Sequence, residues 1–265
     1  MKSYTTGKQD PGNKRNRAGE AERARQTRHK GKIMKVLFIG NSHTFFNDMP
    51  ISFSRMYGQL TGTDAEVTMQ AYGGRTLKWH YDEFMSLRFA LEYGGYDCCV
   101  IQQQAHPFPG EEETAPYMEK IVAMCRSVGT EPVIYMPWAE KKLPENAARH
   151  SALYRKLAEK EKAMLAPVGE LFERARNERP DIDLYFKDGE HASPLGDYMI
   201  ACCFAALLSG KKDLSCLDSK GIDFKLDFEP GVRRLVLPCS AKEAEVDLDP
   251  EKTAYLRKIV EEALA

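Results

Sequence analysis

Three residues of the chain have side chains that could together perform acyl transfer: Ser42, Asp188 and His191. Ser42 follows an apolar run at 36–39, where a buried parallel strand is predicted to end and turn-forming residues begin. Asp188 and His191 are three residues apart, so one turn of chain can bring both side chains to the same site. A serine hydroxyl needs a base to take its proton, and an imidazole needs a carboxylate to hold its tautomer. The three residue types therefore predict a nucleophile, a base and an orienting carboxylate.

Other interpretations of these residues compete with catalysis. Ser42 could simply cap the helix that follows it. In a flavodoxin-like binding module the loop after the first strand would hold a phosphate, but Phe45 and Phe46 are bulky for such a loop, and Asp188 and His191 would have no role. A metal site could use the candidate ligands His43, His80, His106, His191 and Asp188. Beyond the Asp-x-x-His pair, these residues lack the spacing of metal ligands.

Two stretches, GNSHTFFNDMP at 40–50 and DGEHASPLGDY at 188–198, together resemble the SGNH (GDSL-like) hydrolase superfamily. In that family a serine after the first strand works with an Asp-x-x-His motif close to the C-terminus. The likeness covers about 34–210 in the order of its blocks. It implies a serine esterase with Ser42 as nucleophile, His191 as base and Asp188 as its partner, and it implies neither a cofactor nor a metal.

Ester hydrolysis also needs hydrogen-bond donors for the oxyanion of the tetrahedral intermediate. Gly73 and Gly74 fall at a predicted strand-to-helix turn, where backbone N–H groups can come close to a ligand. By resemblance this is the family's glycine block. The N–H groups of Ser42 and Gly74 are therefore the expected donors, with Gly73 as a second candidate.

The sequence departs from the family where most members carry Gly-x-Asn-Asp, whose asparagine also donates to the oxyanion. Three glutamines end the third predicted strand instead, at 102–104. A glutamine amide can make the same kind of hydrogen bond. We predict Gln104 as the third donor, with Gln102 next. The alternative is that these polar residues only satisfy a loop.

The substrate pocket is expected to form from residues that flank these blocks: Asn41, His43, Gly73, His106 and Trp138. His106 aligns nearest to the missing asparagine, and Trp138 follows the fourth predicted strand, where an aromatic ring can wall a pocket. We expect a small-molecule ester with a short acyl chain, and a carbohydrate O-acetyl ester is one candidate. The alternative function is that of a non-catalytic flavodoxin-like protein that binds a small molecule or a carbohydrate.

The fold class follows from the order of the apolar patterns. Strands are predicted at 36–39, 65–71, 96–101, 131–136 and 163–168, and helices at 49–60, 77–92, 114–128, 147–161, 170–177 and 194–208. Strands that alternate with helices indicate a parallel sheet with right-handed crossovers. We therefore predict an α/β fold, a three-layer α/β/α sandwich with a five-stranded parallel sheet of the flavodoxin-like, SGNH hydrolase type.

The charge distribution divides the chain. Residues 1–33 carry ten Lys/Arg and three Asp/Glu, a net charge of +7 that leaves -8 for the rest, and they contain almost no large apolar residue. We predict a disordered basic extension at 1–33. Residues 34–212 should form the hydrolase-like domain. Residues 213–265 should form an appendage on the same domain, with short strands such as 234–237 and a terminal helix at 250–264.

Composition excludes several other classes. The 265 residues are 43% hydrophobic and 29% charged with a net charge of -1, so there is no global attraction to nucleic acid. The longest apolar run, at 198–208, is too short to span a bilayer, and no secretory signal is recognisable. The seven cysteines show no CxxC or zinc-like spacing, which is typical of a reducing compartment. We expect a cytoplasmic protein that has neither a nucleic-acid nor a membrane partner.

Overall fold

A five-stranded parallel sheet forms the centre of the computed structural model, which describes residues 33–223 and 244–265. The strands lie in the order β2-β1-β3-β4-β5, with bounds β1 (Lys35–Gly40), β2 (Glu66–Ala71), β3 (Cys98–Gln102), β4 (Glu131–Tyr135) and β5 (Met164–Ala166). Residues 1–32 of the predicted disordered extension and the predicted strand at 234–237 lie outside the described residues.

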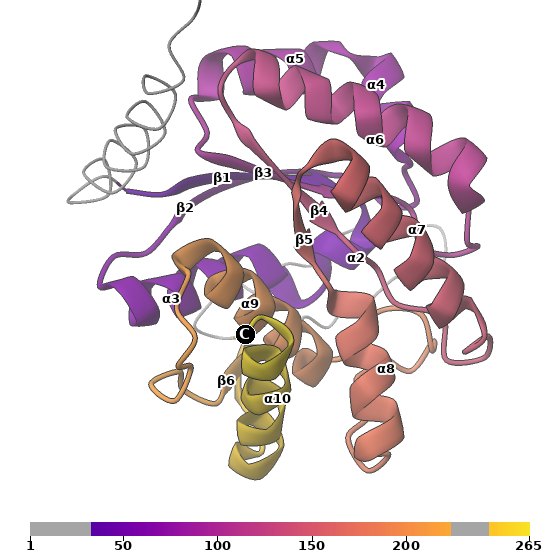
Figure 1. Ribbon diagram of the computed structural model, residues 1–265. Helices are drawn as coiled ribbons and strands as arrows, with labels where there is room; N and C mark the ends of the chain where they lie inside the picture. The colour runs from indigo at the N-terminus through magenta and orange to yellow at the C-terminus, as the bar shows by residue number, and fades with distance from the viewer. Residues whose placement is uncertain (1–32, 224–243) are drawn as a thin grey trace, which may run out of the picture. The chain divides into compact units, whose positions relative to one another are not determined.

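The two faces of the sheet are covered by different helices, as the alternation along β1 requires. Val36 and Phe38 face one core, while Leu37 and Ile39 face the other. The first core is closed by α3 (Met49–Thr61), α8 (Val168–Glu178), α9 (Pro194–Ser209) and α10 (Pro250–Ala263). The second is closed by α4 (Leu77–Glu83), α5 (Met85–Gly94), α6 (Gly110–Ser127) and α7 (Asn146–Glu161) (Figure 1). The predicted three-layer α/β/α sandwich is confirmed.

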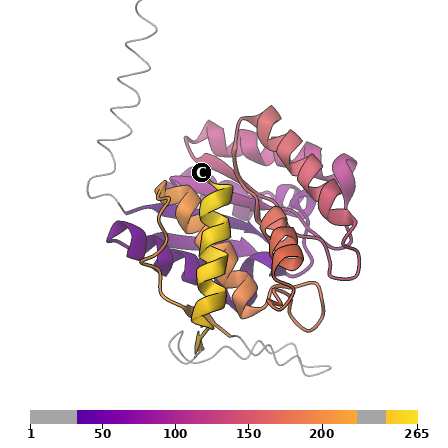
Figure 2. The same ribbon diagram turned by 60° about the horizontal axis from the view of Figure 1, so that its bottom comes forward.

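Helix α9 is apolar on all sides and is buried from Gly196 to Ala206. Such a helix must be covered all round, and here the sheet packs on one side while α10 crosses the other (Figure 2). The start of α9 is fixed by Pro194 in its first turn and by the Ser193 hydroxyl, which accepts the N–H of Gly196. Because His191 lies just before this start, the buried helix anchors the loop that carries it.

The prediction of one helix at 77–92 was wrong. The chain breaks at Phe84, whose φ of 58° lies in the left-handed region and separates α4 from α5. The Glu83 carboxylate accepts both the N–H and the hydroxyl of Ser86, the second residue of α5, and so joins the two helices across the break. The apolar periodicity continues through the break, since Leu77 and Leu87 point into the same core. Periodicity alone therefore did not reveal the break.

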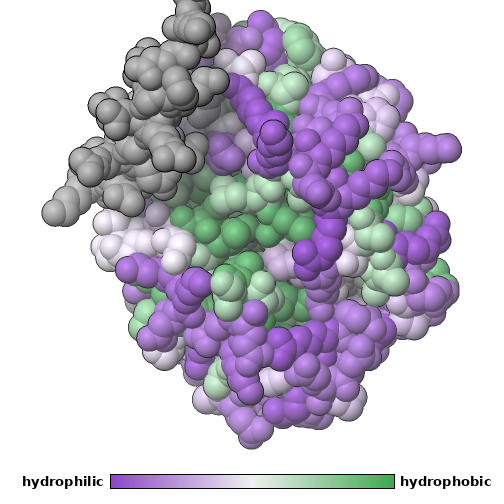
Figure 3. Space-filling view, in the orientation of Figure 1, coloured by the Kyte–Doolittle hydropathy of each residue, from purple (hydrophilic) through white to green (hydrophobic). Residues whose placement is uncertain are grey.

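The C-terminal part of the chain adds a small antiparallel pair, β6 (Lys220–Ile222) and β7 (Glu245–Asp247), before α10. Figure 3 shows the face of the molecule that is turned to the viewer in Figure 1. Hydrophilic residues cover much of this face, and apolar residues gather in its middle. Among the described residues, no helix has the length and the apolar character needed to cross a membrane.

Candidate active site

Ser42 lies directly after β1, at the first position of the short helix α2 (Ser42–Phe45). Asn41 caps this helix, because its side-chain oxygen accepts the N–H of His43 at 3.1 Å. Gly40 makes the turn possible: a Cβ there would stand 2.4 Å from both Gln102 Oε1 and Thr44 Oγ1. Ser42 is half-buried and lies at the carboxyl end of the sheet. Ligands bind at this end in open α/β folds.

His191 and Asp188 form a continuous hydrogen-bonded chain with Ser42. The Ser42 hydroxyl lies 2.7 Å from His191 Nε2, and His191 Nδ1 lies 2.7 Å from Asp188 Oδ2. The other oxygen of Asp188 accepts the backbone N–H groups of Glu190 and His191. Burial alone would raise the pKa of Asp188, but these hydrogen bonds outweigh it and leave the pKa below its ordinary value. Asp188 is thus an anion beside Nδ1–H, which leaves Nε2 free to accept a proton.

The loop that carries Asp188 and His191 is held by buried groups. Gly189, with a φ of 74°, makes the turn between them, and its carbonyl accepts the N–H of Lys141 at 2.9 Å. The indole of Trp138 donates to the Glu190 carbonyl at 2.8 Å. Trp138 is fully buried and stacked on Phe172. The prediction that it lines an open substrate pocket is therefore not supported. Its role in the structure is to hold this loop.

The glycine turn is tied to the nucleophile loop by hydrogen bonds. The Gly40 carbonyl accepts the N–H of Tyr72 at 3.1 Å and also contacts His80 Nε2 at 2.8 Å. Asn41 Nδ2 donates to the Arg75 carbonyl at 3.1 Å, so Asn41, which is buried, positions the turn and is not exposed to substrate. Gly74 has a φ of 68°.

The backbone amides of this region are available to a ligand. Within 33–223 and 244–265, the N–H groups of Ser42, Gly73 and Gly74 have no hydrogen-bond acceptor. Both glycines are exposed. The expected donors thus include free N–H groups on two loops that are hydrogen-bonded to each other.

The three glutamines brace loops against one another. Gln102 Oε1 accepts from Asn41 N and Thr44 Oγ1, while its amide nitrogen donates to the Gln103 carbonyl. Gln102 is fully buried, unlike Gln104, so the structure does not support it as an oxyanion donor. Gln104 Nε2 donates to the His106 carbonyl at 2.9 Å, and an amide nitrogen has a second hydrogen for a ligand. Gln104, which is partly exposed, remains the candidate for that role.

Alanine substitutions separate these two glutamine roles. Gln102→Ala is expected to lower the free energy of unfolding by about 1–3 kcal/mol, because the buried N–H of Asn41 loses its acceptor. Gln104→Ala is expected to leave stability nearly unchanged and to lower kcat by a factor of about 10² if its amide contacts the oxyanion. Urea unfolding and ester kinetics on both variants check this. Equal stability of the Gln102 variant and the wild type would contradict the bracing role.

Three imidazole rings pack together beside the serine. The ring of His43 lies 4.8 Å from that of His191 and 4.9 Å from that of His106, measured between centroids. Burial, followed by the neighbouring His106 and His191, holds the pKa of His43 well below its ordinary value. Burial, with His150 and His191 nearby, lowers the pKa of His106 to about 4. Both side chains are almost fully buried, so the structure does not support the prediction that His43 and His106 line an open pocket.

The buried histidines predict an acid-sensitive fold. The pKa of His106 and of His150 is about 4 in the folded chain, against about 6.5 when unfolded, so between these values only the unfolded chain binds the protons. Stability must therefore fall as pH is lowered through this window, by about 1.4 kcal/mol per pH unit and histidine at most. The buried carboxyl of Asp197 has a raised pKa, so the folded chain holds this proton more tightly than the unfolded chain does. Its effect is therefore opposite to that of the histidines: it favours the folded state as the pH is lowered.

Urea unfolding at pH 7.5 and pH 5 measures this effect. The unfolding midpoint is expected to fall at the lower pH, and to fall less in His150→Gln, which removes one titrating group from its buried place beside Phe108. An unchanged midpoint in the wild type would contradict the prediction.

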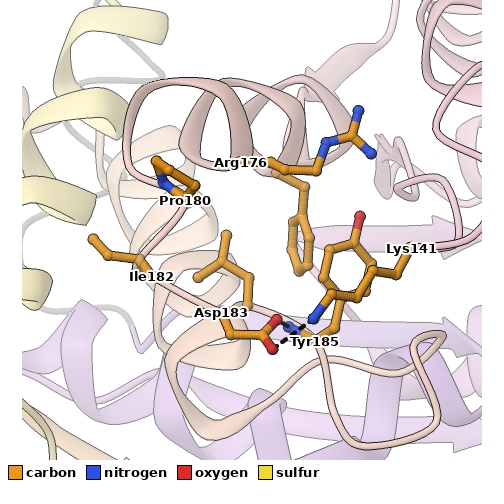
Figure 4. A pocket seen from close by; sticks show the side chains of 8 residues that line it. Lys141, Arg176, Pro180, Ile182, Asp183 and Tyr185 are labelled. Atoms are coloured by element: carbon orange, nitrogen blue, oxygen red, sulfur yellow. Dashed lines mark hydrogen bonds and ion pairs between the residues drawn. The ribbon is translucent and has the colours of Figure 1, made fainter.

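A small pocket of about 110 Å³ lies beside the segment that leads to Asp188. It is lined by Lys141, Phe172, Arg176, Pro180, Ile182, Asp183, Leu184 and Tyr185 (Figure 4). Lys141 Nζ and the Asp183 carboxylate are 2.7 Å apart across it. The Tyr185 hydroxyl donates to the Ala139 carbonyl. The pocket contains none of the predicted site residues.

Metal ligation finds no support in the part of the chain that the structure describes. No group of three or more His, Cys, Asp or Glu side chains there could hold a metal ion. Of the five candidate ligands named from the sequence, His80 lies apart on α4, where it contacts the Gly40 carbonyl.

Comparisons with known proteins agree with this fold. No protein-family model matches the sequence, and the search of curated proteins gives no match. Among solved structures, a DUF4886 family protein from Bacteroides uniformis superposes with a TM-score of 0.60 at 16% identity, over 88% of this chain and 95% of that one. A G-D-S-L family protein from Desulfitobacterium hafniense gives 0.52 at 15% identity, over 66% and 99%.

A third solved structure is the psychrotrophic esterase EstA from a Pseudoalteromonas species. It gives a TM-score of 0.52 at 11% identity, over 66% of this chain and 97% of that one. At these identities the likeness is one of fold. The chain has the fold that the two sequence motifs predict, that of the SGNH (GDSL-like) hydrolases.

Proposed function

We propose that the protein is a serine esterase that hydrolyses a short-chain ester through an acyl-enzyme on Ser42. The observation that supports this most is the chain of two 2.7 Å contacts that links Ser42 Oγ, His191 and Asp188. The free N–H groups of Ser42 and Gly74 on the adjoining loops add the donors that acyl transfer needs. The Pseudoalteromonas protein that shares the fold is itself an esterase.

In the acylation step, His191 Nε2 removes the Ser42 proton as Oγ attacks the ester carbonyl carbon. The carbonyl oxygen becomes an oxyanion, which accepts hydrogen bonds from the N–H groups of Ser42 and Gly74 and from the Gln104 amide. Each donor contributes on the order of 3 kcal/mol to transition-state stabilisation. His191 then gives its proton to the leaving alcohol as the ester C–O bond breaks, and the acyl group stays on Ser42.

Deacylation repeats these steps with water. His191 takes a proton from the water as its oxygen attacks the acyl carbon, and then returns a proton to Ser42 Oγ as the acid leaves. Asp188 stays ionised and stabilises the imidazolium in both steps. The lowered pKa of Asp188 suits this role, because the carboxylate remains charged down to acidic pH.

The packing beside His191 favours a short acyl group. His43 packs against His106 and against Trp138, and all three side chains are almost fully buried. A filled site has little depth for a long chain, so we propose an acetyl-sized acyl group, with a carbohydrate O-acetyl ester as the candidate natural substrate. The alcohol would extend toward the exposed glycine turn.

Hydrolysis of p-nitrophenyl esters of increasing chain length tests the proposal. The purified protein is expected to hydrolyse the acetate with a higher kcat/KM than the butyrate or the octanoate, against Ser42→Ala as the blank. A wild type that matches this blank on every ester would contradict the esterase proposal and favour a non-catalytic protein that binds a small molecule or a carbohydrate.

A further inference from the structure

The loop that follows Ser42 is hydrogen-bonded to the loop that carries His191, and this contact has no part in the mechanism above. Asn47 belongs to the short 3₁₀ helix η1 (Phe46–Asp48) and is buried. Its amide nitrogen donates to the Ala192 carbonyl at 3.0 Å and to Asp197 Oδ2 at 2.6 Å. Ala192 directly follows His191 in the chain, and Asp197 lies in the first turn of α9.

The backbone of Asn47 is held in an unfavourable conformation to make this contact. Asn47 has a φ of 46° and Asp48 a φ of 51°, both in the left-handed region. Two consecutive non-glycine residues in that region cost on the order of 1–3 kcal/mol each and persist where surrounding contacts fix them. For Asn47 those contacts are the two hydrogen bonds of its side chain, whereas the Asp48 side chain makes no cap hydrogen bond.

Two rings complete the contact between the loops. The His191 ring lies between Phe46, at a centroid distance of 4.2 Å and an angle of 17°, and His43, at 4.8 Å and 22°. Both rings come from the segment that carries Ser42. The plane of the imidazole is therefore set by this segment, while the carbonyl next to the imidazole is set by Asn47.

We propose that Asn47 is a positioning residue of the proposed esterase, which holds His191 at hydrogen-bonding distance from Ser42 by fixing the Ala192 carbonyl. Asp197 serves as the second acceptor that orients the Asn47 amide. The proposal rests on the proposed function. It implies that the side-chain hydrogen bonds of Asn47, together with the two rings, set the nucleophile loop against the histidine loop, although the two loops are far apart in the sequence.

Replacement of Asn47 by glycine tests the positioning role, because glycine adopts the left-handed φ without strain. Asn47→Gly removes both hydrogen bonds but tolerates the left-handed φ, and Asp48→Gly is the matched control at the next residue. Asn47→Gly is expected to lower kcat on p-nitrophenyl acetate by a factor of about 10–100 with KM nearly unchanged. Its rate of labelling by a fluorophosphonate should fall in parallel. Asp48→Gly should keep kcat within a factor of about two.

A second variant separates positioning from charge and from general stability. Asp197→Asn keeps an acceptor oxygen for Asn47 and removes the group that can ionise, whose pKa burial raises well above its ordinary value. Because the acceptor oxygen remains, this variant is expected to lose less kcat than Asn47→Gly. Unfolding in urea, measured on all variants, confirms that each is folded under the assay conditions.

The possible outcomes are distinct. A kcat for Asn47→Gly equal to that for Asp48→Gly, or a loss in Asp197→Asn as large as that in Asn47→Gly, would overturn the positioning role while the esterase proposal stands. A wild type that neither hydrolyses the ester nor reacts with the fluorophosphonate would overturn the proposed function itself, and this inference with it.

Discussion

Replacing Ser42 by alanine is expected to lower kcat/KM for p-nitrophenyl acetate by a factor on the order of 10⁴ or more, because no other group can form the acyl-enzyme. Among the described residues the Ser42 hydroxyl makes one hydrogen bond, to His191, so its removal should change the free energy of unfolding by less than about 1 kcal/mol. The measurement is ester kinetics together with urea unfolding.

The matched control for this variant is Ser127→Ala. Ser127 is an exposed serine at the end of α6, whose hydroxyl donates to the Met124 carbonyl. It should retain the full kcat/KM. Residual hydrolysis by Ser42→Ala that approaches the rate of this control would show that the ester is cleaved elsewhere on the protein.

Asp188→Asn is expected to lower kcat by a factor of about 10³–10⁴ while the fold is retained. The asparagine oxygen can still accept the N–H groups of Glu190 and His191, but its NH₂ group then faces His191 Nδ1. The imidazole must turn its acceptor nitrogen toward that NH₂, which places the proton on Nε2. With a proton on Nε2, His191 cannot take the proton of Ser42.

Asp183→Asn is the matched control, because Asp183 lies on the same loop and pairs with Lys141 at the surface. Both carboxyl groups accept a backbone N–H through Oδ1, which asparagine preserves. The Asp183 variant is expected to keep kcat within a factor of about two, since an exposed ion pair contributes little. Equal activity of the two variants would mean that Asp188 does not orient the imidazole.

Local patterns in the sequence were sufficient to predict the sheet and the three polar residues of the candidate triad. The apolar runs of β1 and β3 are nearly continuous because parallel strands are buried on both faces. Ser42 follows β1, and the Asp-x-x-His pair lies in the loop before the apolar helix α9. The structure places their side chains within hydrogen-bond distance across 149 residues of sequence.

The roles of the surrounding residues depend on partners that a local pattern does not identify. The sequence marked the three glutamines as unusual, but it could not show that Gln103 Oε1 accepts the N–H of Leu77, 26 residues away, as well as that of Gln104. Trp138 was predicted to wall a pocket, and its burial against Phe172 became visible only once α8 was placed. Asn47 went unnoticed because an Asn-Asp pair is ordinary turn chemistry. Its two acceptors are about 150 residues away.

Labelling of the purified protein with a fluorophosphonate, followed by mass spectrometry of the peptides, tests the central claim most directly. Such a probe reacts with a serine only when a base activates its hydroxyl. One label per chain on Ser42, absent from Ser42→Ala and strongly slowed in Asp188→Asn, is the predicted result. Absence of the label from Ser42 in a protein that is folded and monodisperse would contradict the account of Ser42 as an activated nucleophile.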